Sequence, residues 1–364
     1  MKDGREMLNS VGILTFTYGD NYGQRLQNLA MQEFLKNYFY HVYTIRQIEK
    51  EESLFCKIKH SAKLLIQGQF FILRKRRNSF NKFNDSYIKF YSIPIDANDV
   101  TAFPRDKFDF FICGSDQIWS PYSCDVNNTF FLTFVEKNKR IALAPSIASE
   151  DIPQDKVEEF REYFKGFNYI STREYAGSNL VQKLTGNLVE TLVDPTLLFD
   201  SDFWIAHEKQ PKNICQGRYA VCYFLGNTSQ LEKINEICRN EGLTVIDILH
   251  DKKYLSLGPD EFIYLIHNAQ KVFTDSYHGT IFSIIFHIPL ILCNREGSNV
   301  DMNSRFETLF SKLGIYSKPL QNTMRDVQVD YLEVENNIVK ERNTFENYFH
   351  KCLSESLKIK FMKE

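Results

Sequence analysis

The side chains best suited to chemistry in this sequence follow short apolar runs that are typical of buried strands. One such run, Lys271–Thr274, leads into a polar turn and then into an apolar run with the character of a buried helix. His278 lies in this turn, and imidazole can donate or accept a proton near neutral pH. A helix start also offers N–H groups and a favourable dipole to an anion. The candidate anion-binding residues beside it are Ser276, Tyr277, Gly279 and Thr280.

Two polar turns in the first half of the chain combine carboxylate and amide side chains. They contain Asp20 and Asn21, and Asp116, Gln117 and Trp119. Carboxylates and amides can hydrogen bond to sugar hydroxyls, and an indole can stack on a sugar ring. These turns are therefore candidates for a sugar site. The alternatives are an ordinary turn with an N-cap, and a core position for the tryptophan.

Arg173 lies at a further predicted junction between a strand and a helix. A guanidinium in such a place can bind a carboxylate or a phosphate through two parallel hydrogen bonds. The alternative is a structural ion pair with Glu174 or with a more distant acid.

Alternating strands and helices in both halves of the chain must position these residues. The predicted strands are Ser10–Phe16, His41–Ile45, Phe108–Cys113, Ile141–Ala144, Tyr169–Ser171, Leu188–Val193, Tyr219–Leu225, Leu243–Ile248, Lys271–Thr274 and Leu290–Leu292. The alternation predicts an α/β protein with two doubly wound, Rossmann-like parallel sheets and a cleft between them. We expect an N-terminal domain over residues 1–194, a C-terminal domain over 195–330, and a helix over 331–364 that packs back on the first domain.

Composition excludes several classes of function. The chain has 364 residues and a formal net charge of −2, so its bulk charge does not indicate a nucleic-acid partner. Its eight cysteines form no Cys-x-x-Cys pair, which predicts reduced thiols and a cytoplasmic protein. We find no signal-peptide pattern and no apolar run long enough to span a membrane. The chain has no His-Glu-x-x-His motif, and no metal site is predicted.

The segment Lys57–Lys82 is the most basic part of the chain. Its lysines and arginines alternate with leucine, isoleucine and phenylalanine, which predicts one or two amphipathic helices with a break at Gly68. A solvent-exposed basic face is the simpler interpretation. The alternative is peripheral contact with the anionic inner face of a membrane or with a lipid-diphosphate substrate.

Five motifs of the chain, in this order, resemble those of the polysaccharide pyruvyl transferase family. They are Val11–Phe16 with Asp20–Gly23, Phe111–Trp119, Ile170–Glu174, Val193–Leu198 and Thr274–Thr280. The resemblance implies a glycosyltransferase-B-like fold of two Rossmann-like domains. It also implies transfer of pyruvate from phosphoenolpyruvate to two hydroxyls of a sugar, which gives a cyclic ketal. Phosphoenolpyruvate would be a donor substrate, and no cofactor is implied.

The resemblance assigns the donor and the acceptor to opposite domains. His278 and Arg173 match the family's residues near the donor, with the C-terminal domain as the donor side. The acceptor is expected against the N-terminal domain, near Asp20, Asn21 and Asp116. The implied acceptor is a sugar of a capsule or exopolysaccharide, or a lipid-linked oligosaccharide precursor of such a cell-surface polysaccharide.

This chain departs from the family pattern at two places. Members often carry alanine after Asn-Tyr-Gly, where this chain has Gln24-Arg25. They often carry Ala-Ala-Ser-Phe-Gly where this chain has Ala144-Pro145-Ser146-Ile147-Ala148. Both departures fall at predicted strand ends, where they could alter acceptor specificity.

The expected reaction needs an acid and a base, as well as cations for the two anionic groups of phosphoenolpyruvate. His278 suits one proton-transfer role, and Asp116 or Asp20 suits the other. Two rival functions fit the same fold. One is a nucleotide-sugar-dependent glycosyltransferase, and the other is a catalytically inactive glycan-binding protein.

Overall fold

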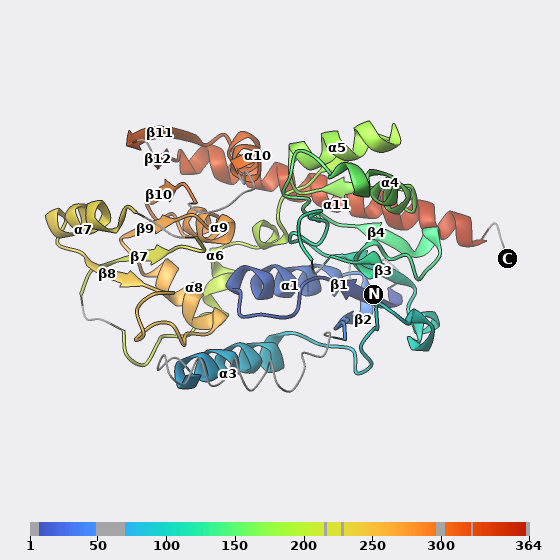
Figure 1. The fold of residues 1–364 in the computed structure, drawn as a ribbon, viewed down its shortest axis with the longest axis horizontal. Helices are drawn as coiled ribbons and strands as arrows, with labels where there is room; N and C mark the ends of the chain where they lie inside the picture. Colours follow the sequence, from blue (N-terminus) through green and yellow to red (C-terminus); the bar gives the residue numbers. More distant parts are fainter. Residues whose placement is uncertain are drawn as a thin grey trace.

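Two α/β units lie side by side in the chain, each built around its own sheet (Figure 1). The computed structural model describes residues 7–48, 70–124, 126–214, 217–226, 229–295, 303–321 and 323–361. Helices flank both sheets, and the first helix of the chain lies at the centre of the molecule, between the two units (Figure 1).

The N-terminal sheet is parallel, with the strand order β2-β1-β3-β4. Its strands are β1 (Leu8–Leu14), β2 (Phe39–Thr44), β3 (Phe110–Cys113) and β4 (Arg140–Ala142). β5 (Ser171–Thr172) and β6 (Glu190–Thr191) form a separate parallel pair rather than continuing this sheet. Every residue of β3 is buried, because helices and loops cover both faces of a parallel sheet.

The C-terminal sheet has the strand order β11-β12-β10-β9-β7-β8. Its parallel part comprises β7 (Tyr219–Tyr223), β8 (Thr244–Asp247), β9 (Lys271–Thr274) and β10 (Leu290–Cys293). β11 (Tyr316–Gln321) and β12 (Met324–Gln328) are antiparallel strands at one edge. The expectation of a purely parallel sheet was therefore wrong. β11 is the edge strand and β12 lies between β11 and β10, and both contain too many polar residues to show the apolar runs that marked the other strands.

Helices connect the strands and cover the sheets. They are α1 (Tyr22–Leu35), α3 (Phe70–Tyr87), α4 (Val157–Lys165), α5 (Tyr175–Thr185), α6 (Ser201–Ile205), α7 (Leu231–Asn240), α8 (Pro259–His267), α9 (Tyr277–Ile285), α10 (Asn303–Leu313) and α11 (Tyr331–Phe361). Among the described residues, no helix is long and apolar enough to cross a membrane.

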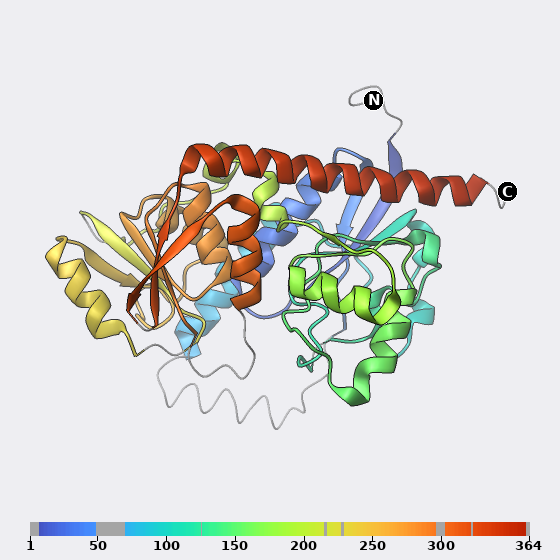
Figure 2. The same ribbon diagram turned by 90° about the horizontal axis from the view of Figure 1, so that it is seen from above.

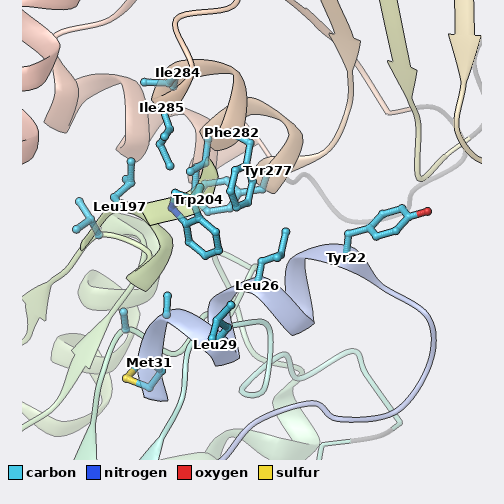
Figure 3. Close-up of a cluster of buried hydrophobic side chains, with 14 of the residues drawn as sticks. Tyr22, Leu26, Leu29, Met31, Leu197, Trp204, Tyr277, Phe282, Ile284 and Ile285 are labelled. Atoms are coloured by element: carbon cyan, nitrogen blue, oxygen red, sulfur yellow. The ribbon is translucent and has the colours of Figure 1, made fainter. Parts of the chain in front are cut away.

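One hydrophobic core cluster includes residues of both units. Leu26 and Leu29 of α1 lie near Trp204, and Phe282 of α9 packs edge-on against the indole at 4.9 Å between ring centroids (Figure 3). Tyr22 at the start of α1 stacks on Phe262 of α8, with centroids 4.6 Å apart. Because apolar packing of this kind resists sliding, it fixes α1 of the first unit against α8 and α9 of the second.

The last helix runs along both units, as Figures 1 and 2 show. Phe345 and Phe349 of α11 meet Phe34 of α1 edge-on, at 5.2 and 5.3 Å between ring centroids. The hydroxyl of Tyr38 donates to Glu346 at 2.8 Å. The chain therefore returns from the C-terminal unit to cover an apolar patch on the N-terminal unit.

The basic segment predicted over Lys57–Lys82 falls partly outside the described residues, which resume at Phe70. From there α3 packs beside α8, and Arg76 is buried rather than part of a solvated face. Its guanidinium donates to the hydroxyl of Tyr22, to the carbonyl of Asp20 and to the carbonyl of Leu255. Arg76 thus connects the loop before α1 to the C-terminal unit.

Candidate active site

The starts of α1 and α9 meet where the two units join. Asn21 caps α1 by accepting from the Gln24 N–H, and Ser276 caps α9 by accepting from the Gly279 N–H. His278, in the first turn of α9, lies directly against Gly23 in the first turn of α1. A Cβ atom placed on Gly23 would lie only 2.1 Å from Nδ1 of His278, so glycine is required for this close approach. The two polar turns predicted from the sequence are therefore adjacent.

A buried carboxylate connects the two predicted donor residues. Oδ2 of Asp194 accepts from Nη1 of Arg173 at 2.6 Å and from Oγ of Ser115 at 3.2 Å. Nε2 of His278 lies 3.4 Å from the same oxygen. Asp194 and Arg173 are fully buried as side chains. Arg173 from one unit and His278 from the other are thus held by a single acid.

The electrostatics of this group favour the charged forms of both Asp194 and Arg173. Burial acts to raise the pKa of the Asp194 carboxyl, but His278 and Arg173 hold that pKa well below its usual range. Burial also acts to lower the pKa of Arg173, yet the Asp194 carboxylate raises it above its usual value. Asp194 therefore remains an anion at neutral pH.

A second buried arginine comes from α10 of the C-terminal unit. The guanidinium carbons of Arg173 and Arg305 lie 4.5 and 5.5 Å from the centroid of the Tyr277 ring. Burial and the charge of Arg173 lower the pKa of Arg305 to about 10. With its amide oxygen facing α10, Gln117 accepts from Nη1 and Nη2 of Arg305 at 2.5 and 3.2 Å. Two cations, one from each unit, are thus held close to one aromatic ring.

Several buried polar atoms in this group make no hydrogen bond to the described residues. They are Nε and Nη2 of Arg173, Nε of Arg305, Nε2 of His278, Oγ1 of Thr280 and Oε2 of Glu174. Buried polar groups in native proteins are nearly always paired, so such a concentration calls for a partner. Half of these atoms are guanidinium donors, and an anionic ligand is the partner that suits them.

Asp116 occupies a strained position at the end of β3. Its φ angle of 97° is rare for a residue other than glycine. Its carbonyl accepts from the Ser146 N–H at 2.7 Å, and its carboxylate accepts from the N–H of Gln117 at 2.8 Å. Strain of this kind costs about 1–3 kcal/mol and is concentrated at functional sites. The geometry therefore keeps Asp116 among the candidates for chemistry.

The loop that pairs with Asp116 is fixed by Glu174. Oε1 of this buried carboxylate accepts from the N–H groups of Ile147 and Ala148, at 2.7 and 2.9 Å. Ala144 and Ala148 both have φ angles of 53°, a region that favours glycine. The family pattern has glycine at the position of Ala148, so this departure is a local strain that Glu174 helps to hold.

An open hollow of about 520 Å³ lies between α5 and α10. Its lining includes Tyr175 and Ser304, the neighbours of Glu174 and Arg305 in the chain. Thr308 of α10 accepts from the Tyr175 N–H at 3.0 Å across the junction. The hollow therefore lies at the junction between α5 and α10, the helix that carries Arg305.

Three predicted contributions to a ligand site do not survive in the structure. Trp119 is fully buried, stacks on Phe131 and donates its indole N–H to a backbone carbonyl, so it belongs to the core and not to a sugar site. The N–H groups of Gly279 and Thr280 donate to the side chain and carbonyl of Ser276, which removes them as anion donors. Gly279 is instead required for packing, because a Cβ there would lie 2.7 Å from Oγ1 of Thr274.

The acceptor-side acid Asp20 is turned away from the histidine. Its carboxylate accepts from Nε of Arg77 at 2.8 Å, on α3. The loop that carries it still adjoins His278 through Gly23, whereas Asn21 serves as the α1 cap.

Sequence reasoning missed Asp194 and Arg305. Asp194 was interpreted as a break between domains, although the Val193–Leu198 motif that contains it was recognised. Oδ1 of Asp194 caps a turn by accepting from the Thr196 N–H, whereas Oδ2 accepts from Nη1 of Arg173. Arg305 carried no local signal, because its position in the site depends on how α10 packs against the first unit.

No group of three or more histidine, cysteine, aspartate or glutamate side chains in the described part of the chain is placed to hold a metal ion.

Comparison with known proteins gives one family. Residues 21–297 match the family model described as polysaccharide pyruvyl transferase. None of the curated protein sequences matches the chain.

Solved structures with a similar fold include a protein described as a "putative UDP-N-acetylglucosamine 2-epimerase" from Listeria monocytogenes. It aligns with a TM-score of 0.50 at 10% identity, over 97% of this chain and 91% of that chain. The UDP-GlcNAc 2-epimerase from Neisseria meningitidis, solved with UDP-GlcNAc bound, aligns with a TM-score of 0.45 at 9% identity, over 98% of this chain and 99% of that chain. At such identity the first likeness concerns the fold alone, and it confirms the predicted glycosyltransferase-B-like architecture.

Proposed function

Because the chain belongs to the polysaccharide pyruvyl transferase family, we propose that it moves pyruvate from phosphoenolpyruvate to two hydroxyls of one sugar. The products are a cyclic ketal on the sugar and inorganic phosphate. The acceptor in this proposal is a sugar unit of a cell-surface polysaccharide, such as a capsule or exopolysaccharide, or of its lipid-linked precursor.

Two buried guanidinium groups with unfilled donor positions carry this proposal. Phosphoenolpyruvate has a phosphate and a carboxylate on the same carbon atom, so it needs two cationic groups close together. Arg173 and Arg305 both contact Tyr277 and keep unpaired N–H groups. Mutual repulsion between them would be relieved by one ligand with two anionic groups. A neutral sugar would not supply that relief.

His278 is suited to act as the acid in this reaction. It would protonate the methylene carbon of the donor, which makes the neighbouring carbon electrophilic. The first sugar hydroxyl then adds to that carbon and loses its proton to a base, for which Asp116 is the candidate. The bond from this carbon to phosphate breaks, the second hydroxyl closes the ketal ring, and its proton leaves with the phosphate. Asp194 is a positioning residue, because its Oδ2 lies 3.4 Å from Nε2 of His278.

Phosphate release from phosphoenolpyruvate in the presence of a panel of sugar acceptors tests the function directly. Mass spectrometry of the acceptor should show the gain of pyruvate less one water. His278→Ala should lower turnover by about 10²–10⁴-fold with the fold intact, which is the usual cost of a lost acid or base. The exposed His250 supplies the matched control, since His250→Ala should leave turnover unchanged.

A nucleotide-sugar-dependent glycosyltransferase would respond differently in a thermal-shift assay. We expect stabilisation by phosphoenolpyruvate and little by nucleotide sugars, because the cations are placed for one compact ligand. Stabilisation by nucleotide sugars alone would favour the glycosyltransferase. No stabilisation by either donor, with binding of glycans retained, would favour an inactive glycan-binding protein.

A further inference from the structure

Besides Arg76, Arg173 and Arg305, a fourth arginine is buried. Arg25, in the second turn of α1, is only 4% exposed. Its Nη2 donates to the carbonyl of Gly19 at 2.6 Å, whereas Nε and Nη1 make no hydrogen bond. Burial lowers the pKa of Arg25 to about 10, which shows that its surroundings oppose the positive charge.

No carboxylate is hydrogen bonded to this guanidinium among the described residues. Asp20 lies near enough to influence Arg25 electrostatically, but its carboxylate accepts from Arg77 at 2.8 Å. The closest aromatic contact is Phe80, whose ring centroid lies 5.7 Å from the guanidinium carbon. The charge of Arg25 is therefore incompletely compensated by the described part of the chain, and an anion from outside would compensate it.

On a neighbouring face of α1, two amide oxygens also have no hydrogen-bond partner among the described residues. Oε1 of Gln24 and Oε1 of Gln27 are buried atoms without a hydrogen-bond partner. The amide nitrogen of Gln27 donates to Thr15, whose hydroxyl donates to the carbonyl of Ser115, next to Asp116. Gln27 also lies one helical turn after Gly23, the residue in contact with His278. Unfilled amide oxygens suit the hydroxyl groups of a sugar.

Asp116 lies within electrostatic range of both arginine sites. Its charge acts on Arg173 and also on Arg25. The Gly19 carbonyl that Arg25 binds also belongs to the loop that leads to Gly23, the residue against His278.

From this arrangement we propose that the acceptor carries an anionic group, a carboxylate or a phosphate, which Arg25 binds. Gln24 and Gln27 accept hydrogen bonds from hydroxyls of the same sugar. This inference rests on the proposed pyruvyl transfer, and it narrows the acceptor to an acidic sugar or a sugar phosphate. It also gives a role to Gln24-Arg25, where this chain departs from the family pattern.

Binding of three small probes tests the inference without requiring turnover. Methyl glucuronide carries a carboxylate, glucose 1-phosphate carries a phosphate, and methyl glucoside is neutral. We expect the full chain to bind one of the anionic probes at least about tenfold more tightly than the neutral probe, as calorimetry or ligand-observed NMR would measure. Which anionic probe binds distinguishes the carboxylate from the phosphate. Raising the salt concentration should weaken only the anionic probe.

Substitutions assign the effect to Arg25. Arg25→Gln should remove the preference for the anionic probe, and Arg25→Lys should keep part of it, while the affinity for phosphoenolpyruvate stays unchanged in both. Gln24→Ala, at a half-buried side chain whose loss the fold should tolerate, should weaken the neutral and anionic probes alike. Circular dichroism of each variant checks that the fold is kept.

Two results would overturn the inference. One is equal binding of anionic and neutral probes by the unmodified chain. The other is a parallel loss of phosphoenolpyruvate affinity in Arg25→Gln, which would assign Arg25 to the donor. Failure of the proposed function would give a different result, because phosphoenolpyruvate would then release no phosphate with any acceptor.

Discussion

Replacing Asp194 with asparagine should damage both the stability and the activity of this protein. The substitution keeps the size of the side chain and one oxygen that can still cap Thr196. It removes the negative charge that pairs with Arg173 at 2.6 Å. A fully buried guanidinium would then lose its counter-ion.

The size of the effect follows from this burial. Breaking a buried ion pair by removing one partner typically costs about 3–5 kcal/mol. Asparagine keeps the packing, but its NH2 group would face Arg173 when its oxygen caps Thr196, so we expect a cost of at least about 3 kcal/mol. That is a large part of a total stability of about 5–15 kcal/mol. Turnover should fall as well, because Oδ2 of Asp194 is also the oxygen nearest to Nε2 of His278.

Urea unfolding followed by circular dichroism measures the stability change from the midpoint and slope. Asp200→Asn is the matched control, because Asp200 is an exposed N-cap six residues later and asparagine caps helices equally well. The control should stay within about 0.5 kcal/mol of the unmodified protein. If Asp194→Asn also stays within that range, the buried pair does not stabilise the junction and the reasoning fails.

Four further outcomes follow from the same geometry. The difference in unfolding free energy between the unmodified protein and Asp194→Asn should be constant near neutral pH and shrink only below about pH 4. The pKa of Asp194 is lower in the folded than in the unfolded protein, so its charge stabilises the fold above the unfolded-state pKa and loses that effect as the pH falls. An equally large difference in acid, measured by urea unfolding, would contradict this. Gly23→Ala should lower turnover at least about tenfold while costing little stability, since a methyl group would displace the His278 ring; unchanged kinetics would show that the ring need not lie there. Arg305→Gln should raise KM for phosphoenolpyruvate more than it lowers kcat, and an effect on kcat alone would remove Arg305 from donor binding. Binding to anionic lipid vesicles in sedimentation assays should fall as salt is raised if the segment Lys57–Lys82 contacts membranes, and absence of binding at low salt would exclude that contact.

The alternating strands and helices could be predicted because a buried parallel strand requires a continuous apolar run. β1, β7 and β9 each have such a run, followed by a turn and a helix, whereas β3 has the run and the polar turn without a helix start. The β11–β12 hairpin was missed because an edge strand exposed to solvent needs no such run. The hydrophobic pattern of a sequence reflects which residues are buried, so it locates central strands but not polar strands near the edge of a sheet.

The candidate site was predictable only where a residue follows a strand directly. His278 and Arg173 satisfied that rule and are joined by one carboxylate. Trp119 satisfied it too, yet its indole turned inward, because the choice between core and surface depends on packing with Phe131 rather than on local sequence. Arg305 violated it, since tertiary packing of α10 alone brings its guanidinium to the junction.

The route of α11 has a consequence for how the protein is made. Phe34 and Tyr38 on the N-terminal unit are shielded by Phe345 and Phe349, which lie close to the end of the chain. During synthesis the N-terminal unit emerges first, and its aromatic patch stays uncovered until Phe345 and Phe349 have been made. Premature termination before α11 would leave that patch open permanently and would favour aggregation or proteolysis. Complete translation is therefore a condition for the first half of the protein to be finished.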